Sequence, residues 1–546
     1  MELGIGQRES LCSEANKLSV TFADCIASAK LRLCPFGYAS MTGVCVRQNE
    51  LPGSSRIFVD FLYDFERVKN FFSFDPVDAD ALTKAVSQIE YPAERRVAVA
   101  SALREVNGDH PSVEIFARPG TVAVLTGQQV GLYGGPAYTL YKALSAISVA
   151  RQITAAGQPA IPIFWLATED HDVEEIRSAA FWDQTITAEA ASDGRPAGVH
   201  ALAGLPNELA LSPEVAALAQ RHYRNGVSFG DSFLGLLKEL LAPLGMLFAD
   251  PLAPALRGIG AEFLATAARR APELSRSLVR RNSELAAAGY HAQVHFAADE
   301  TSLFFLLESG RRRQLKFNSQ TYDGEAMAAH GAALSPNALL RPVWQDWLFP
   351  TAAVVAGPGE IAYFAQSSVL YRELLGRMPV MLPRAFFTLV DEKSAKIIER
   401  YRVRFADILQ DEEHVRQTLA DRLIPPDLKR TLRDTENRLE STLEELENQL
   451  EAFDPTLAAA LDLSRRKIRY QFAKNYSKVV SEVLRKSEQA QRQAAHLSHR
   501  LAPRGHLQER HYSLLALLSD FGLELIPTLL DNIHHGCHDH HVLLLG

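Results

Sequence analysis

Cysteine is scarce in this chain of 546 residues, and its few copies are unevenly placed. Four of the five lie in the first 45 positions, as Cys12, Cys25, Cys34 and Cys45, and the fifth is Cys537. The long middle of the chain therefore offers no cysteine nucleophile. No C-x-x-C pair occurs, which argues against a zinc site among the first four.

Long apolar runs and an excess of basic residues are also missing. No stretch approaches the roughly 20 apolar residues that span a bilayer. The N-terminus lacks a basic segment followed by an apolar one, so it does not resemble a signal peptide. The formal net charge is −8, from 57 basic and 65 acidic residues, which disfavours a general nucleic-acid binder. We therefore expect a cytoplasmic protein that binds neither membrane nor nucleic acid.

The length predicts two or three domains, and 47% apolar residues are enough for real cores. Residues 1–50 differ in composition from the rest of the chain, and Met41 is a candidate for the native start. An extension that belongs to the native protein is the alternative. The expected units are an N-terminal extension over 1–50, a core over 51–390 with a connective subdomain inserted at about 185–340, a helical domain over 391–503, and a helical return with a histidine-rich tail over 504–546.

The most informative stretch is TVAVLTGQQVGLYGGPAYTLYK at 121–142, followed by IPIFWLATEDHD at 161–172. Each begins as an apolar run and ends abruptly in polar side chains, as buried parallel strands do at a ligand crevice. Residues 137–155 between them have helical periodicity. A strand, a helix and a strand of this length predict a parallel sheet with a right-handed crossover, and thus an α/β fold.

The first strand runs into a glycine-rich loop that contains Gly127 and Gly131. Glycines at a strand-to-helix turn let backbone N–H groups approach an anion. Gln128 and Gln129 add hydrogen-bonding groups, and Lys142 lies about two turns into the helix. The helix start contributes two further candidates, Tyr138 and Thr139. The loop matches neither a P-loop nor a dinucleotide fingerprint, so a purely structural turn is an equally good interpretation.

The second strand ends in Glu169, Asp170, His171 and Asp172. Four consecutive ionisable groups at the end of a buried strand are costly unless they are paired or solvated. Asp170 and His171 are therefore candidates for the site. Asp172, with Glu175 three residues later, has an equally good interpretation as the N-cap of the next helix.

A third polar segment comes after the apolar runs beyond position 340. We expect binding residues here, at a strand end flanked by glycine, although a proline–glycine turn with a capping glutamate is the alternative. Arg384 lies in a later apolar run, and a buried arginine requires an anionic partner. The candidates in this segment are Gln345, Asp346, Gly357, Glu360, Tyr363 and Arg384.

From 391 to 500 the chain becomes rich in Glu, Arg, Leu, Gln and Lys. Leu432, Leu439 and Leu446 recur every seven residues, which indicates a coiled coil. Asp454-Pro455 breaks this helix, and a second one is expected from about 456 to 500. Together they predict an antiparallel helical hairpin. A shorter β-hairpin is expected at 301–317, with its turn at Ser309-Gly310.

The segment HHGCHDHH at 534–541 contains five histidines and a cysteine. Such a run can hold Zn²⁺ or Ni²⁺. We favour a polar tail that only adsorbs metal, and therefore assign no metal site.

These motifs, in this order, resemble one family. The segments TGQQVGLYGGPAYTLYK, FWLATEDHD, RPVWQDWLFPTAAVVAGPGEIAYF and PVMLPRAFFTL are similar to those of the cysteine ligases of bacillithiol biosynthesis, the BshC family. The resemblance runs from about residue 51 to the end of the chain. It implies a Rossmann-like core related to class I aminoacyl-tRNA synthetases, with connective insertions and a long α-helical antiparallel coiled-coil domain that forms a homodimer.

The reaction implied by the resemblance joins L-cysteine to glucosaminyl-malate through an amide, as the last step of the pathway. ATP is one candidate for the activating cosubstrate, although the HIGH and KMSKS signatures of the synthetases are absent. On this basis Lys142 and the Gly127–Gly135 backbone would bind an anion or phosphate. His171, oriented by Asp170, would act as base or substrate anchor. Gln345, Asp346 and Glu360 would contact sugar hydroxyls or the cysteine ammonium.

Two other functions stay open at this point. A transferase could use a donor that is already activated, without ATP. A non-enzymatic scaffold could use the coiled coil as its working part, but it would have no need of four ionisable residues at a strand end.

Overall fold

The computed structural model describes residues 42–297, 301–316, 318 and 321–545. Its central sheet has five strands, all parallel, in the order β11-β10-β2-β3-β6. Numbered along the chain, this order reads 5-4-1-2-3, which is the Rossmann order. The expected α/β, Rossmann-like core is therefore confirmed. The strands are β2 (Val122–Gln128), β3 (Ala160–Leu166), β6 (Leu247–Ala249), β10 (Thr351–Ala356) and β11 (Val380–Pro383).

The sheet is buried on both faces because alternate residues of its strands enter two different cores. Val122 and Val124 of β2 belong to one core, which α6 (Tyr138–Ala155) covers. Ala123 and Leu125 belong to the other. Strands buried on both faces read as continuous apolar runs, which is why the two strand predictions succeeded.

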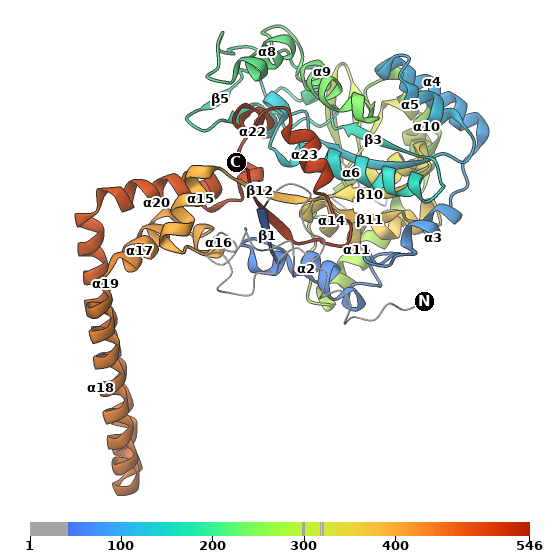
Figure 1. Cartoon of the computed structure of the whole chain (residues 1–546). Coiled ribbons are helices and arrows are strands. Elements are labelled where there is room, and N and C mark those ends of the chain that lie inside the picture. Colours follow the sequence, from blue (N-terminus) through green and yellow to red (C-terminus); the bar gives the residue numbers. More distant parts are fainter. Residues whose placement is uncertain (1–41, 298–300, 317, 319–320, 546) are drawn as a thin grey trace.

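Helices cover both faces, as Figure 1 shows. Those on the Ala123 and Leu125 side include α2 (Arg56–Tyr63), α4 (Ala93–Asn107), α5 (Pro111–Ala117), α10 (Pro254–Arg269), α11 (Ala271–Ala287), α13 (Arg341–Leu348) and α14 (Pro358–Leu374). Those on the α6 side include α3 (Ala81–Ser87), α8 (Pro213–His222), α9 (Phe229–Leu241), α22 (Leu514–Phe521) and α23 (Leu525–Asp531).

The expected connective subdomain at 185–340 does not form one continuous insertion. Strand β6, inside this range, belongs to the central sheet, and α10 and α11 pack on the main core. The expected hairpin is confirmed: Ser309 and Gly310 have φ of 51° and 74°, the left-handed conformations that a tight hairpin turn requires. The small elements of this region are α7 (Val173–Ile176), β4 (Ser178–Ala180), β5 (Thr185–Thr187), β7 (Thr301–Glu308), β8 (Arg311–Lys316), α12 (Gly324–Ala328) and β9 (Leu334–Pro336).

A second, smaller sheet corrects two predictions about the ends of the chain. β1 (Thr42–Val46) pairs antiparallel with β13 (His540–Leu544), which also pairs parallel with β12 (Phe386–Val390). Residues 42–50 are therefore part of the fold rather than of an extension, and residues 540–544 are not a tail. The physical reason is apolar burial, because Val44, Val46 and Val542 pack in a third core. The Met41 hypothesis and the rest of the extension fall outside the described residues.

The helical domain projects from the globular part as a long arm (Figure 1). α18 (Pro426–Phe453) and α19 (Pro455–Lys486) form the expected hairpin, and Asp454 caps α19 by accepting a hydrogen bond from the Thr456 N–H. The single helix expected over 456–500 is wrong, because Ser487 breaks it and caps α20 (Glu488–Leu501). The base of the arm consists of α15 (Glu392–Tyr401), α16 (Phe405–Ile408) and α17 (Glu412–Leu423), and α21 (Gln508–His511) leads back into the core.

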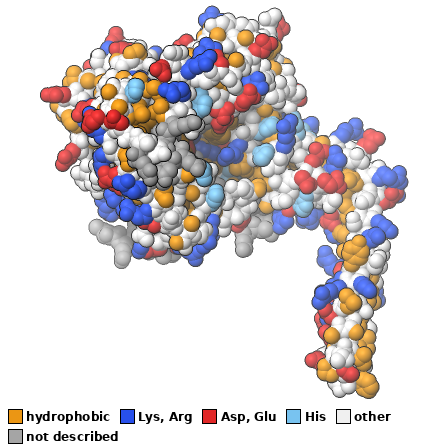
Figure 2. Space-filling model, turned by 180° about the vertical axis from the view of Figure 1, so that it is seen from behind, with side chains coloured by type: hydrophobic (Ala, Val, Ile, Leu, Met, Phe, Trp, Pro, Cys, Tyr) orange, Lys and Arg blue, Asp and Glu red, His pale blue; other side chains and the backbone are white. Residues whose placement is uncertain are grey.

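Apolar side chains remain exposed along the arm, as Figure 2 shows in orange. They include Leu439, Leu446, Phe453, Leu463 and Tyr470. One hairpin thus leaves part of its apolar surface uncovered. Among the described helices, none combines the length and the apolarity that crossing a membrane requires.

Candidate functional site

A crevice of about 350 Å³ opens where β2 and β10 diverge, at their carboxyl ends. This is the point where the strand order reverses, and open α/β sheets bind ligands there. Eleven of the candidates predicted from the sequence line this crevice: Gly127, Gln128, Gln129, Tyr138, Lys142, Asp170, Gln345, Gly357, Glu360, Tyr363 and Arg384.

Lys142 lies in the wall of the crevice and is almost fully buried. Its Nζ lies 2.7 Å from Glu360 Oε2 and donates to the Gly127 carbonyl at 2.5 Å and to Gln128 Oε1 at 3.2 Å. Burial lowers the pKa of Lys142, and the charge of Glu360 opposes that shift. The lysine is therefore a preorganised cation whose charge is partly compensated by one carboxylate.

Glu360 connects this lysine to the start of α14. Its Oε2 also accepts the Gly357 N–H at 2.7 Å, so the expected capping glutamate is present. The capping interpretation is confirmed, and the same glutamate also lines the crevice, where its binding role stays a prediction.

The glycine loop does not form the expected phosphate cradle. The N–H groups of Gly131, Gly134 and Gly135 donate to the Gln129 carbonyl, the Tyr223 hydroxyl and the Leu132 carbonyl. Close packing explains the glycine at 127, since a Cβ there would lie 2.7 Å from the Trp165 carbonyl oxygen of β3. The structural interpretation thus accounts for this loop, while its glutamine side chains face the crevice.

Asp170 reaches the crevice from the end of β3. Burial alone would raise its pKa, but a hydrogen bond with His171 and the charges of Arg341 and Arg312 outweigh burial and hold the pKa below its ordinary value. Gln129 Nε2 also donates to its Oδ2 at 3.2 Å. Asp170 is therefore a fixed carboxylate at neutral pH.

His171 points away from the crevice lining, toward β8. Its Nδ1 lies 3.0 Å from Arg312 Nη1 and 3.6 Å from Asp170 Oδ1. Arginine only donates, so Nδ1 of His171 accepts here. An arginine that the sequence did not identify therefore orients the ring, while Asp170 Oδ1 accepts the backbone N–H of His171 at 2.7 Å.

Five further candidates lie outside the crevice lining. Glu169 is buried in an ion pair with Arg257 at 2.8 Å. Asp172 caps α7 by accepting the Glu175 N–H. Asp346 is buried and accepts the Tyr371 hydroxyl proton at 2.6 Å. The last two of the five are Gly131 and Thr139, both beside the crevice rather than in it.

Arg384 has the anionic partner that the sequence required. Its guanidinium donates to both carboxylate oxygens of Glu509, at 3.0 and 2.5 Å, and both side chains are buried. Glu509 lies on α21, which connects the arm to the core. The arginine lines the crevice, but this pair also fastens the end of β11 to α21.

Sequence reasoning missed part of the charge of the crevice. Arg341 and Arg510 line it together with Lys142 and Arg384, and Glu175 adds a carboxylate. The pKa of Arg341 is raised: burial would lower it, but Tyr363, Asp170 and Glu169 outweigh burial. The sequence could have indicated Arg341, because it begins the segment RPVWQDW that also contains the candidates Gln345 and Asp346. No local sequence pattern indicated Arg312, since only the β7–β8 hairpin brings it to Asp170.

Comparison with known proteins identifies both parts of the chain. Residues 41–385 match the family "Bacillithiol biosynthesis BshC, N-terminal Rossmann-like domain". Residues 387–545 match "Bacillithiol biosynthesis BshC, C-terminal coiled-coil domain".

Full-length relatives support the same assignment. A protein of Solibacter usitatus is 42% identical over 92% of this chain and 99% of its own length. A protein of Koribacter versatilis is 32% identical over 91% of this chain and 99% of its own length. A protein of Salinibacter ruber is 30% identical over 88% of this chain and 93% of its own length. All three carry the name "Putative cysteine ligase BshC". The chain therefore belongs to the BshC family of bacillithiol biosynthesis.

Proposed function

We propose that this chain joins L-cysteine to glucosaminyl-malate through an amide bond, as the last step of bacillithiol biosynthesis. The observation that carries the proposal is the charge of the crevice. Lys142, Arg341 and Arg510 line it together with Asp170 and Glu360. The substrates bring two ammonium groups and several carboxylates, so a crevice with both signs of charge matches them.

Amide formation sets three requirements: an activated carboxylate, a deprotonated amine, and stabilisation of the oxyanion. We assign Asp170, with Glu175, to the cysteine ammonium. We assign Arg341 and Arg510 to the malate carboxylates. Lys142 would stabilise the developing oxyanion, since a buried cation exerts a stronger field than an exposed one.

His171 is less suited to act as the base than as a positioning residue. Its Nδ1 is engaged by Arg312, and its ring lies outside the crevice lining. The carboxylate of Glu360 is within 2.7 Å of Lys142 and lines the crevice, so it is the better candidate to accept a proton. Proton removal by Glu360 would require Lys142 to shift toward the substrate.

ATP is the activating cosubstrate that we propose, with its phosphates held by cationic side chains rather than by the glycine loop. One observation favours the alternative, a donor that is already activated. Three loop N–H groups that would cradle phosphate are bonded within the protein. The two cosubstrate assignments differ in whether nucleotide is consumed.

We further propose that the arm pairs with a second copy of this chain. The apolar side chains exposed along it would be covered by an equivalent surface, as heptad positions of coiled coils are.

The test uses the purified full-length chain with cysteine, glucosaminyl-malate and ATP, and mass spectrometry of the products. We expect bacillithiol to form, with AMP or ADP released only when both substrates are present. Formation of bacillithiol from a pre-activated cysteine donor, such as a cysteinyl thioester that releases its thiol, but not from cysteine and ATP, would replace ATP by that donor. In parallel, the chain is expressed in a bacillithiol-producing bacterium that lacks its own enzyme. A stable, folded chain that restores no bacillithiol and leaves glucosaminyl-malate accumulated would overturn the proposed reaction.

A further inference from the structure

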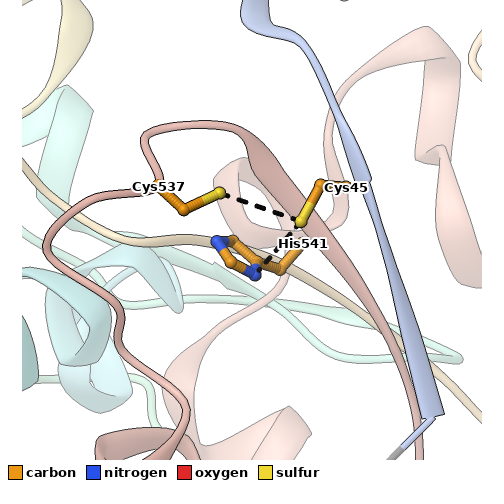
Figure 3. A group of neighbouring side chains, drawn as sticks. All are labelled: Cys45, Cys537 and His541. Carbon is orange, nitrogen blue, oxygen red and sulfur yellow. Dashed lines mark hydrogen bonds between the residues drawn. The ribbon is translucent and has the colours of Figure 1, made fainter. Parts of the chain in front are cut away.

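Three potential metal ligands meet at the second sheet, far from the crevice residues in sequence. They are Cys45 on β1, His541 on β13 and Cys537 in the turn before β13 (Figure 3). Cys45 and His541 are directly opposed partners of the antiparallel β1–β13 pair, so both side chains emerge on the same face of the sheet. The turn closes through the hydrogen bond from the Cys537 N–H to the His534 carbonyl.

The distances between the ligand atoms fit a tetrahedral metal ion. Cys45 Sγ lies 3.8 Å from Cys537 Sγ and 3.8 Å from His541 Nδ1. All three groups offer atoms within 4.8 Å of one another. Zinc bonds of about 2.3 Å to sulfur and about 2.0 Å to nitrogen, at tetrahedral angles, place two sulfurs about 3.8 Å apart and a sulfur and a nitrogen about 3.5 Å apart. The side chains are thus already spaced as zinc ligands are.

The surroundings match this chemistry. Cys45 and His541 are each 2% exposed, and Cys537 is half-buried. Two thiolates neutralise one Zn²⁺, so the ion could be buried without leaving net charge, and its binding would release the two thiol protons. The ligand set of two cysteines and one histidine is one that zinc accepts.

We propose that Cys45, Cys537 and His541 bind one zinc ion, which fastens β1 to the C-terminal segment. The fourth position faces a cavity of about 320 Å³ that Cys537 and His541 line together with His538. It is filled by water or by a side chain of this segment. His538 lines the same cavity but lies outside the cluster of three ligands.

The metal site would strengthen the attachment of β1 to the sheet, which the backbone hydrogen bonds of so short a strand hold only weakly. β1 is a five-residue edge strand, and Cys45 is 496 positions away from His541. Closing so long a loop costs conformational entropy, and a bound metal offsets that cost in the folded state. The histidine-rich segment is therefore a partner in a buried site rather than a polar tail that adsorbs metal.

The first experiment measures metal in the full-length protein, purified under reducing conditions and then dialysed. We expect about one zinc per chain. Replacement of zinc by cobalt(II) should give a sulfur-to-cobalt charge-transfer band and the intense visible bands of tetrahedral cobalt. Chelation should lower the apparent Tm. Reduced wild-type protein that binds no stoichiometric zinc and gives no thiolate–cobalt band would overturn the proposal, and no variant is needed for that result.

Two matched variants separate a site from adsorption. Cys537→Ser changes a half-buried turn residue, and we expect at least a ten-fold loss of zinc affinity and loss of the charge-transfer band. His535→Ala removes a histidine of the same segment that lines the same cavity but lies outside the ligand cluster, and zinc should be retained. Circular dichroism confirms that both are folded. Equal zinc loss in both variants would show adsorption, and a Cys45–Cys537 disulfide in freshly prepared protein would show redox pairing; either contradicts the site.

Discussion

Lys142 Nζ and Glu360 Oε2 lie 2.7 Å apart across the point where the strand order of the sheet reverses. The lysine is on α6, which comes after β2, and the glutamate is on α14, which comes after β10. An ion pair between a buried lysine and a partly exposed glutamate thus joins the two halves of the Rossmann-like core, in addition to the pairing of β2 with β10. Any ligand that enters the crevice meets this pair at its wall.

Replacing the lysine tests whether this pair takes part in the chemistry. Lys142→Met removes the cation while keeping most of its volume, and we expect the rate of bacillithiol formation to fall by about 100-fold or more. Lys69→Met is the matched control, because Lys69 also lies 2.7 Å from a glutamate, Glu66, but on the surface. Equal activity of both variants, with normal folding, would remove Lys142 from the mechanism.

Arg341 tests the assignment of the malate carboxylates. Arg341→Met should raise the KM for glucosaminyl-malate by about 10-fold or more, because it removes a charge-assisted contact, and should change the KM for cysteine less. Arg341→Lys should recover part of the loss. Steady-state kinetics with each substrate varied in turn make this distinction. A larger increase in the KM for cysteine than in the KM for glucosaminyl-malate would assign Arg341 to the cysteine carboxylate instead of the malate carboxylates.

Asp346 gives the protein a pH-dependent stability that is separate from catalysis. Burial raises its pKa to about 6 from an ordinary value of 3.8, although Arg377 and Tyr371 oppose the shift. The folded state therefore binds more protons than the unfolded state between about pH 4 and 6, and stability falls as pH rises through that window. The loss amounts to about 3 kcal/mol in total, at about 1.4 kcal/mol per pKa unit.

Asp346→Asn keeps an acceptor for the Tyr371 hydroxyl but does not titrate. Thermal unfolding of this variant should depend less on pH between 4 and 6 than that of the wild type. Asp109→Asn, at a fully exposed carboxylate, is the control and should leave the pH profile unchanged. If wild type and Asp346→Asn give parallel profiles, the assigned pKa shift is wrong.

The buried pair Arg384–Glu509 should be costly to break. Glu509→Gln leaves a buried guanidinium without its counter-charge, and we expect a loss of about 3–5 kcal/mol in the free energy of unfolding. Glu482→Gln is the control, because Glu482 has a similar two-pronged contact with Arg485 on the exposed surface of α19, where solvent screens the pair and it contributes little. Denaturant unfolding of the two variants should differ clearly, and similar small losses would contradict the argument.

The arm supplies the test of self-association. The double variant Leu439→Glu and Leu446→Glu places charges on two exposed apolar positions, and light scattering after gel filtration should then report a monomer. Lys474→Glu, an exposed polar position of α19, should leave the dimer intact. A wild-type protein that is monomeric at all concentrations tested would end this proposal.

The parts of the fold that depend on local pattern were predictable. β2 and β3 were recognisable because strands buried on both faces are uniformly apolar, and their abrupt ends marked the crevice. The break at Asp454-Pro455 was visible because aspartate caps a helix and proline fits its first turn. Arg384 was correctly expected to have an anionic partner.

The parts that depend on tertiary contacts were not predictable. Arg312 reaches Asp170 only because the β7–β8 hairpin folds back over the site, and no local pattern encodes that. Asp346 lies on a helix whose polar residue turns inward to Tyr371, away from the crevice. β1 and β13 find each other across nearly the whole sequence, so the composition of either segment alone suggested an extension or a tail.

The central position of β13 in the second sheet has a consequence for synthesis on the ribosome. β12 and β1 both pair with β13, which lies between them, and they do not pair with each other. Both are translated before β13, so their pairing edges stay open until the last segment has been translated. The second sheet is therefore a post-translational step of folding, whereas all five strands of the central sheet are already available when the arm begins to emerge. Premature termination anywhere in the arm would leave the central sheet without α22 and α23 on one face, and β1 and β12 without β13, so the product would be a target for chaperones and proteases.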